Sequence, residues 1–194
     1  MAIIVPAALR RWRPVGRAHV LREKGGLALV EQRFRHPGTG KAVPFISFTR
    51  QDGVTVVPLT TDGEIVLVRQ FKQAVRDLIL EAPGGALKPG EDPVEAARRE
   101  LRQETGFEAA TVVRTSPRVG FLISPRRSPS IFHTCIATGC RFHGKQRLDR
   151  REDAIEVRTY TMSEIWQLIK NGEIHSEETV FAILYAERLG LLPL

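Results

Sequence analysis

The sequence has few of the features that mark disulfide-bonded or membrane-spanning proteins. It contains only two cysteines, Cys135 and Cys140, among 194 residues. Two are too few for a disulfide framework, so we expect both thiols to be packed and the protein to work in a reducing cytoplasm. No apolar run reaches the ~18–20 residues that a membrane-spanning helix needs, and no membrane partner is expected. Long repeats and low-complexity stretches are also missing, which leaves one compact globular chain as the expectation.

Acidic residues are scarce in the first 50 residues, although the chain has 22 of them and a net charge of +7. Residues 1–50 carry ten basic and two acidic side chains, and residues 51–194 carry 19 and 20. Within the second part, 77–108 holds eight acids against four bases, whereas 109–151 holds nine bases against one acid. This distribution suits a cation site beside a polyanion, and it equally suits an unevenly charged surface. The sequence contains no basic motif interleaved with aromatic residues of the kind that binds nucleic acid. The basic first 50 residues nevertheless keep an RNA substrate open as an alternative.

Turn residues divide the chain into short apolar runs that predict strands. The expected strands are 17–23, 28–35, 43–50, 54–59, 65–68, 78–81, 110–118, 130–138 and 154–161. A helix is expected from Asp92, which can cap it, to about Thr105, before Gly106. Two further helices are expected at 162–171 and 176–189. Many strands with a few helices indicate an α+β fold with layered helices and sheet.

The mid-chain helix carries the residues that point to chemistry. Glu100 and Glu104 are four residues apart, so their carboxylates project from one face of the helix. A hard divalent cation with oxygen ligands turns the repulsion between two such carboxylates into a favourable arrangement. The Pro83-Gly84-Gly85 turn allows the backbone to approach the helix closely. A solvated helix rich in Glu/Arg pairs is the other interpretation of the same pattern.

The whole spacing resembles the Nudix box, G-x5-E-x7-R-E-U-x-E-E-x-G-U, where U is a bulky apolar residue. Eight of its nine fixed positions match, and the ninth carries Gln103 where the family has Glu. The matching residues are Gly85, Glu91, Arg99, Glu100, Leu101, Glu104, Gly106 and Phe107. The segments 66–72 and 80–85 resemble the ADP-ribose pyrophosphatase (nucleoside diphosphate sugar hydrolase) branch of this superfamily.

The resemblance implies the architecture of the chain. It implies the Nudix fold, an α/β/α sandwich with a mixed β-sheet, preceded by antiparallel strands that help to form a homodimer. We therefore expect residues 51–194 to form the Nudix hydrolase domain. Residues 1–50 would be a basic strand region of the same unit that serves dimerisation and the substrate site.

The resemblance also implies a metal site with Mg2+ as cofactor and Mn2+ as a possible substitute. Glu100 and Glu104 would be the principal ligands, with the carbonyl of Gly84 and, through a water, Gln103. One fewer carboxylate at Gln103 leaves the number of ions open. Glu91 and Arg99 would orient the loop and the helix behind these ligands. In this branch an acid on a loop after the box acts as general base or extra ligand.

Further residues would complete the catalytic and substrate sites. Glu152 or Asp153 matches the acidic loop, and the sequence does not decide between them. Arg69 and Lys72 would bind phosphate or ribose oxygens. Phe45 and Arg50 match positions that hold the base, and Phe45 fits a core residue as well. Weaker candidates for anion binding are Arg126 and Arg127.

The expected function is Mg2+-dependent hydrolysis of the pyrophosphate bond of ADP-ribose or a related nucleoside diphosphate sugar. The products would be a nucleoside monophosphate and a sugar phosphate. Two alternatives stay open at this point. One is a Nudix hydrolase of GDP-mannose, a dinucleoside polyphosphate or a capped RNA. The other is a catalytically weakened module that binds ADP-ribose, with Gln103 as the mark of lost chemistry.

Overall fold

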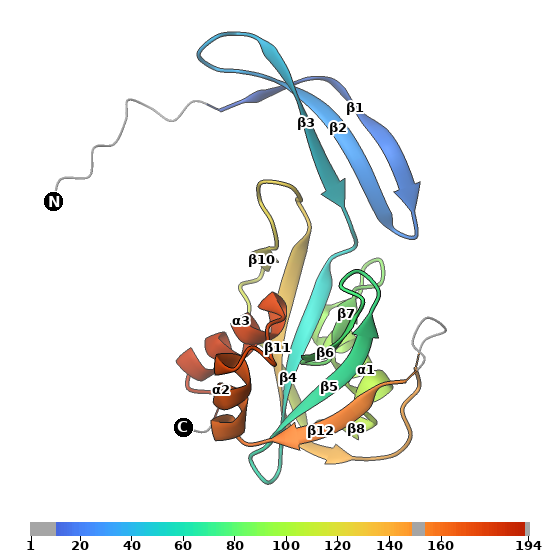
Figure 1. Cartoon of the computed structure of the whole chain (residues 1–194), viewed down its shortest axis with the longest axis vertical. Helices are drawn as coiled ribbons and strands as arrows, with labels where there is room; N and C mark the ends of the chain where they lie inside the picture. Colours follow the sequence, from blue (N-terminus) through green and yellow to red (C-terminus); the bar gives the residue numbers. More distant parts are fainter. Residues whose placement is uncertain (1–10, 149–153, 193–194) are drawn as a thin grey trace, which may run out of the picture. The chain divides into compact units, whose positions relative to one another are not determined.

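A computed structural model describes residues 11–148 and 154–192 of the chain. These residues form two compact units (Figure 1). Unit 1 contains residues 11–51 together with 122–130, and unit 2 contains 52–121, 131–148 and 154–192. In neither unit is a helix of the described residues long and apolar enough to cross a membrane.

Unit 1 is built on a three-stranded antiparallel sheet, as the first three expected strands predicted. Its strands are β1 (Arg13–Lys24), β2 (Leu27–Arg35) and β3 (Ala42–Thr49), in the order β1-β2-β3. The turn before β3 is fixed by His36, whose Nδ1 accepts the N–H groups of Gly38 and Thr39, each at 3.0 Å. The segment 122–130 joins this sheet through the Phe48 N–H, which donates to the Arg127 carbonyl at 2.9 Å.

Unit 2 contains a mixed sheet whose main path runs β10-β11-β4-β5-β12. β4 pairs parallel with β11 and antiparallel with β5, and β12 lies antiparallel at the other side of β5. The main strands are β4 (Gly53–Thr60), β5 (Ile65–Lys72), β11 (Ile131–Phe142) and β12 (Glu156–Tyr160). The shorter strands are β6 (Asp77–Glu81), β7 (Gly84–Ala86), β8 (Phe107–Glu108), β9 (Thr111–Arg114) and β10 (Phe121–Leu122).

Helices cover both faces of this sheet, which confirms the predicted α+β sandwich (Figure 1). Helix α1 (Pro93–Thr105) packs on one face around Leu101, and α2 (Met162–Lys170) and α3 (Glu177–Arg188) pack on the other around Ile165 and Ile183. β4 alternates between the two cores: Val54 and Val56 face α1, whereas Val57 belongs to the other core together with Ile65 and Leu67 of β5.

Helix α1 starts and ends as the sequence predicted. The Asp92 carboxylate accepts the N–H of Val94 at 2.8 Å, and Pro93 occupies the first turn. Gly106 has a φ of +74° and donates its N–H to the Arg102 carbonyl at 3.0 Å. These caps fix the position of the helix within the unit, and thereby the face that carries Glu100 and Glu104.

Both cysteines are buried and unpaired. Cys135 and Cys140 lie on β11 in the core under α1. Burial raises the pKa of each thiol to about 12, so neither forms a thiolate at neutral pH. Their packing leaves them no part in the chemistry of the site.

Candidate active site

Two buried carboxylates of α1 form the centre of the candidate site. Glu100 is 8% exposed and Glu104 is 2% exposed, one helical turn apart. β7 lies directly against them. The Gly84 N–H donates to Glu104 Oε2 at 2.9 Å, and a Cβ placed on Gly85 would lie 2.3 Å from Glu100 Oε1. Only a residue without a side chain allows the strand to come this close to the carboxylates.

Arg99 connects Glu100 to Glu91 and to β7, and its ion pair with Glu91 is called the brace below. Its guanidinium forms a bidentate pair with Glu91, with Nε–Oε1 and Nη2–Oε2 distances of 2.8 Å. It also donates to Glu100 Oε1 at 2.6 Å and to the Ala86 carbonyl at 3.0 Å. One side chain therefore connects the helix, β7 and the loop between them.

The electrostatics of the brace follow from these contacts. The hydrogen bond from Arg99 is the largest cause that lowers the pKa of Glu91 to about 2, and the Lys88 N–H adds to it at 2.8 Å. The two carboxylates in turn raise the pKa of Arg99. Both groups are thus charged throughout the neutral range, and the brace is a permanent ion pair.

Gln103 lies at the edge of the same cluster. Its side-chain oxygen accepts a hydrogen bond from Arg99 Nη1 at 3.2 Å. The two residues lie one helical turn apart on α1. The amide therefore satisfies the guanidinium without adding a negative charge.

Glu81 is a site residue that the sequence reasoning missed. It ends β6, and Gln70 Nε2 lies 3.1 Å from its Oε1 and 3.5 Å from Glu104 Oε1. Lys72 forms an ion pair with the same Glu81 oxygen at 2.5 Å. The available signal in the sequence was a single acid two residues before Pro83, at the start of the Pro83-Gly84-Gly85 turn.

The donor set suits a magnesium ion. No group of three His, Cys, Asp or Glu side chains converges as a ready metal cluster in residues 11–148 and 154–192. Mg2+ does not require one, because it commonly binds through one or two carboxylates together with waters and substrate phosphates. Glu100 and Glu104 supply two oxygen ligands against a strand that leaves room for no side chain. The residues present therefore fit the ion.

Two basic residues predicted to bind substrate lie on β5, the strand beside Glu81. The buried Nε of Arg69 has no hydrogen-bond partner within the part of the chain that the structure describes. Lys72 is already paired with Glu81. A buried donor without an acceptor is costly, and an anionic oxygen bound at Arg69 would satisfy it.

The remaining described candidates belong to unit 1. Phe45 and Arg126 line one pocket of about 560 Å3, and Trp12 and Phe34 make edge-to-face contacts with Phe45. Phe45 is 43% exposed, so it is not the core residue that its strand pattern also allowed. Arg127 lines the same pocket. Arg50 is exposed, and its backbone N–H and carbonyl both bond to Ser130 Oγ.

Glu152 and Asp153, the two candidates for the general base, lie outside the described residues. The structure describes the chain up to Leu148 and again from Ala154. The described candidates in unit 2 are therefore the predicted metal ligands, Arg99, Glu91 and the two basic residues of β5.

Known proteins are similar to this chain in sequence and in fold. The family described as NUDIX domain matches residues 49–182. An ADP-ribose pyrophosphatase of Bacillus subtilis is 30% identical over 162 residues, which cover 84% of this chain and 78% of that protein. A methanol dehydrogenase activator of Bacillus methanolicus is 33% identical over 156 residues, covering 79% and 74%. A crystal structure of an ADP compounds hydrolase superposes with a TM-score of 0.81 at 16% identity, covering 96% of this chain and all of that one.

The fold of that structure agrees with the α/β/α sandwich described above, and the matched range contains the helix with Glu100 and Glu104. The resemblance predicted from the box is thereby confirmed: the chain belongs to the NUDIX domain family and is a Nudix hydrolase.

Proposed function

We propose that this Nudix hydrolase cleaves the pyrophosphate bond of ADP-ribose or a related nucleoside diphosphate sugar. The products are a nucleoside monophosphate and a sugar phosphate. The observation that carries the proposal is the pair of buried carboxylates, Glu100 and Glu104, held against the glycine strand β7. The similarity to an ADP-ribose pyrophosphatase supports the choice of substrate class.

Magnesium is the proposed cofactor, with manganese as a substitute. Glu100, Glu104 and the carbonyl of Gly84 would hold it, and Gln103 would reach it through a water. When bound, Mg2+ acts as a Lewis acid on the phosphates and lowers the pKa of water. Arg99 keeps Glu100 in place through its 2.6 Å bond, and the Gly84 N–H does the same for Glu104. The chain thus presents its ligands already oriented before any ion binds.

The two basic residues of β5 would bind the substrate's phosphates. Arg69 offers a buried donor that no described group accepts. Lys72 would exchange its contact with Glu81 for a phosphate oxygen, which places Glu81 beside the bound diphosphate. An acid from the segment after β11, Glu152 or Asp153, would take the proton of the attacking water.

The aromatic pocket of unit 1 would bind the nucleoside base. Phe45 offers an exposed ring that Trp12 and Phe34 hold in place, and Arg126 supplies a planar cation on the same pocket. A purine stacks on both kinds of group. Arg50, which directly follows β3, would also contact the base.

The chain is also proposed to act as a cytoplasmic homodimer. Exposed apolar side chains are frequent on the sheet of unit 1, including Val20, Leu27, Leu29 and Ile46, and such surfaces mark protein interfaces. Sedimentation equilibrium at micromolar concentration should give twice the chain mass of 21.7 kDa. A single-chain mass would overturn the dimer and leave the proposed reaction untouched.

A substrate panel tests the proposed reaction. The chain with Mg2+ is incubated with ADP-ribose, ADP-glucose, GDP-mannose, a dinucleoside polyphosphate and a capped RNA, and the products are identified by chromatography. We expect AMP and ribose 5-phosphate from ADP-ribose. Preferential cleavage of another compound would show that this compound, and not ADP-ribose, is the substrate. Binding of ADP-ribose without any hydrolysis would overturn the enzyme and favour a binding module.

A further inference from the structure

The C-terminal end of α1 is held by a segment that follows β11. The last carbonyls of a helix have no partner within it and need donors from elsewhere. Here the Arg147 N–H donates to the Gln103 carbonyl and the His143 N–H to the Gly106 carbonyl, both at 2.9 Å. Between them, the side-chain amide of Gln146 donates to the Glu104 carbonyl at 2.5 Å. The helix turn that carries Glu104 is thus fixed by its own backbone as well as by its carboxylate.

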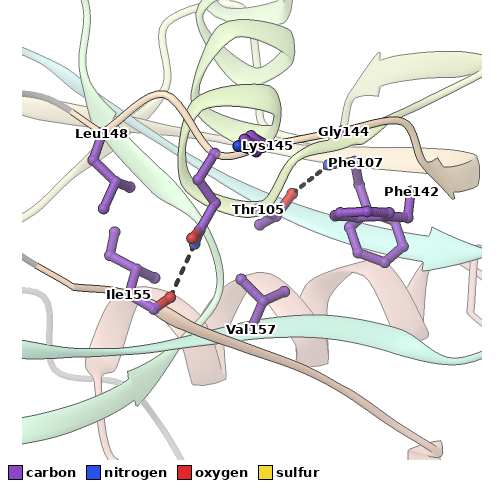
Figure 2. Close-up of a pocket in the computed structure, with 9 residues that line it drawn as sticks. Thr105, Phe107, Phe142, Gly144, Lys145, Leu148, Ile155 and Val157 are labelled. Atoms are coloured by element: carbon purple, nitrogen blue, oxygen red, sulfur yellow. Dashed lines mark hydrogen bonds between the residues drawn. The ribbon is translucent and has the colours of Figure 1, made fainter.

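Gln146 makes a second bond that leads to another element. Its Nε2 also donates to the Ile155 carbonyl at 2.9 Å, and this is the bond that reaches Ile155 in Figure 2. Ile155 directly precedes β12, whose first residue, Glu156, pairs with Arg69 on β5. The two hydrogens of one amide therefore connect the helix of Glu104 to the strand beside Arg69.

Thr105 at the end of α1 and Ile155 before β12 are buried, and a pocket opens beside them. The end of α1 and the start of β12 border an open pocket of about 660 Å3. Figure 2 shows Thr105, Phe107 and Phe142 on one part of its wall and Ile155 and Val157 on another. Beside this space the amide of Gln146 forms a direct hydrogen-bonded link between the two elements.

We infer that Gln146 is a positioning residue of the active site: its amide holds the backbone of Glu104 and the start of β12 at a fixed spacing. The inference rests on the proposed function, in which Glu104 holds the metal and Arg69 binds phosphate. Loss of the amide lets the last turn of α1 move relative to β5, so Glu104 loses its orientation toward the metal.

Amide hydrogen exchange tests the contact without reference to activity. Gln146→Leu keeps the size of the side chain and removes both donors, and Gln146→Glu keeps its shape without an N–H. In both variants the Arg147 amide, which bonds to the same helix end, should exchange roughly tenfold faster or more. Val66 to Val68 in the core should not change. Gln167→Leu on the exposed face of α2 is the matched control and should behave as the wild type.

Steady-state kinetics then test the role in the site. For ADP-ribose, well below the unfolding temperature, kcat should fall roughly tenfold in both Gln146 variants, with KM changed less than about threefold. A double-mutant cycle separates positioning from a general structural effect. In a Glu104→Gln background, Gln146→Leu should lower kcat by less than about a further threefold, because the carboxylate that Gln146 positions is already removed.

Three results would overturn the inference. They are unchanged exchange at Arg147, full kcat in both Gln146 variants, and a tenfold loss that persists in the Glu104→Gln background. A wild-type chain that hydrolyses no nucleoside diphosphate sugar would overturn the proposed function, and the catalytic role of Gln146 with it. Unchanged exchange in an active enzyme would overturn the role of Gln146 alone, so the two failures are distinguishable.

Discussion

Glu100 and Glu104 show how single residues make an unfavourable arrangement stable. Two like charges one turn apart repel each other, and burial adds a desolvation cost to each carboxylate. The fold compensates with a guanidinium at 2.6 Å from Glu100 and a backbone N–H at 2.9 Å from Glu104. The spacing of the box predicted the pair, Arg99 and Glu91. Glu81 was not predictable in the same way, because only the pairing of β5 with β6 brings it beside Gln70 and Lys72.

The ion pair between Glu91 and Arg99 predicts a dependence of stability on pH. The pKa of Glu91 is about 2 in the folded chain, against 4.5 ordinarily, so the folded state favours the charged form. The stabilisation is fully present above pH 4.5 and is lost as the pH falls toward 2. Allowing for solvent screening, the wild type should lose about 1–2 kcal/mol more than Glu91→Gln between pH 5.5 and 2.5.

Urea unfolding at several pH values measures this difference. Glu95→Gln is the control, since Glu95 lies on α1, the helix of Arg99, with its side chain 69% exposed. Its free energy of unfolding should follow the wild type at every pH. Parallel curves for the wild type and Glu91→Gln would contradict the account of the brace.

At the scale of elements, turn residues and caps predicted the long strands and all three helices. The sequence could not reveal β7, β8 and β10, which are two or three residues long. β7 contains two glycines, and its extended form depends on pairing with β4 across Gly53 to Thr55. The parallel pairing of β4 with β11 was equally hidden, because an apolar run does not encode its neighbour.

Gly106, just after α1, lies against the segment that follows β11. Its φ is +74°, and a Cβ there would lie 2.2 Å from the Gly144 carbonyl oxygen. Gly172 has a similar φ of +77° with no neighbour within 4 Å of a Cβ. Gly172→Ala should therefore cost about 1 kcal/mol of backbone strain, and Gly106→Ala at least about 2 kcal/mol more.

Chemical denaturation of both glycine variants gives the two costs directly. Their difference isolates the steric clash, because the backbone strain is common to both positions. Equal losses of stability would show that the contact between Gly106 and Gly144 does not hold the helix end.

For the whole molecule, the candidate residues divide between two units. The candidate metal ligands, the Arg99–Glu91 ion pair and the basic residues of β5 lie in unit 2, whereas Phe45, Arg50 and Arg126 lie in unit 1. Resemblance to the family suggested both sets from the sequence. The pocket around Phe45 could not be predicted, because it needs the segment 122–130 beside the sheet of residues 13–49.

Phe45→Ala tests whether this division separates binding from chemistry. Removal of the ring should raise KM for ADP-ribose roughly tenfold and leave kcat within about threefold, because the base lies far along the substrate from the reacting phosphorus. Val43→Ala, two residues earlier on β3 and outside the pocket lining, is the control and should change neither constant. A fall in kcat with unchanged KM for Phe45→Ala would contradict the assignment of the pocket.

The helix of Glu100 and Glu104 is proposed to carry out metal-dependent cleavage of a diphosphate. The most direct test compares the products formed from ADP-ribose and Mg2+ by the wild type, Glu104→Gln and Glu95→Gln. We predict AMP and ribose 5-phosphate from the wild type and from Glu95→Gln, and a rate at least about a hundredfold lower for Glu104→Gln. Equal rates for Glu104→Gln and the wild type would contradict the account.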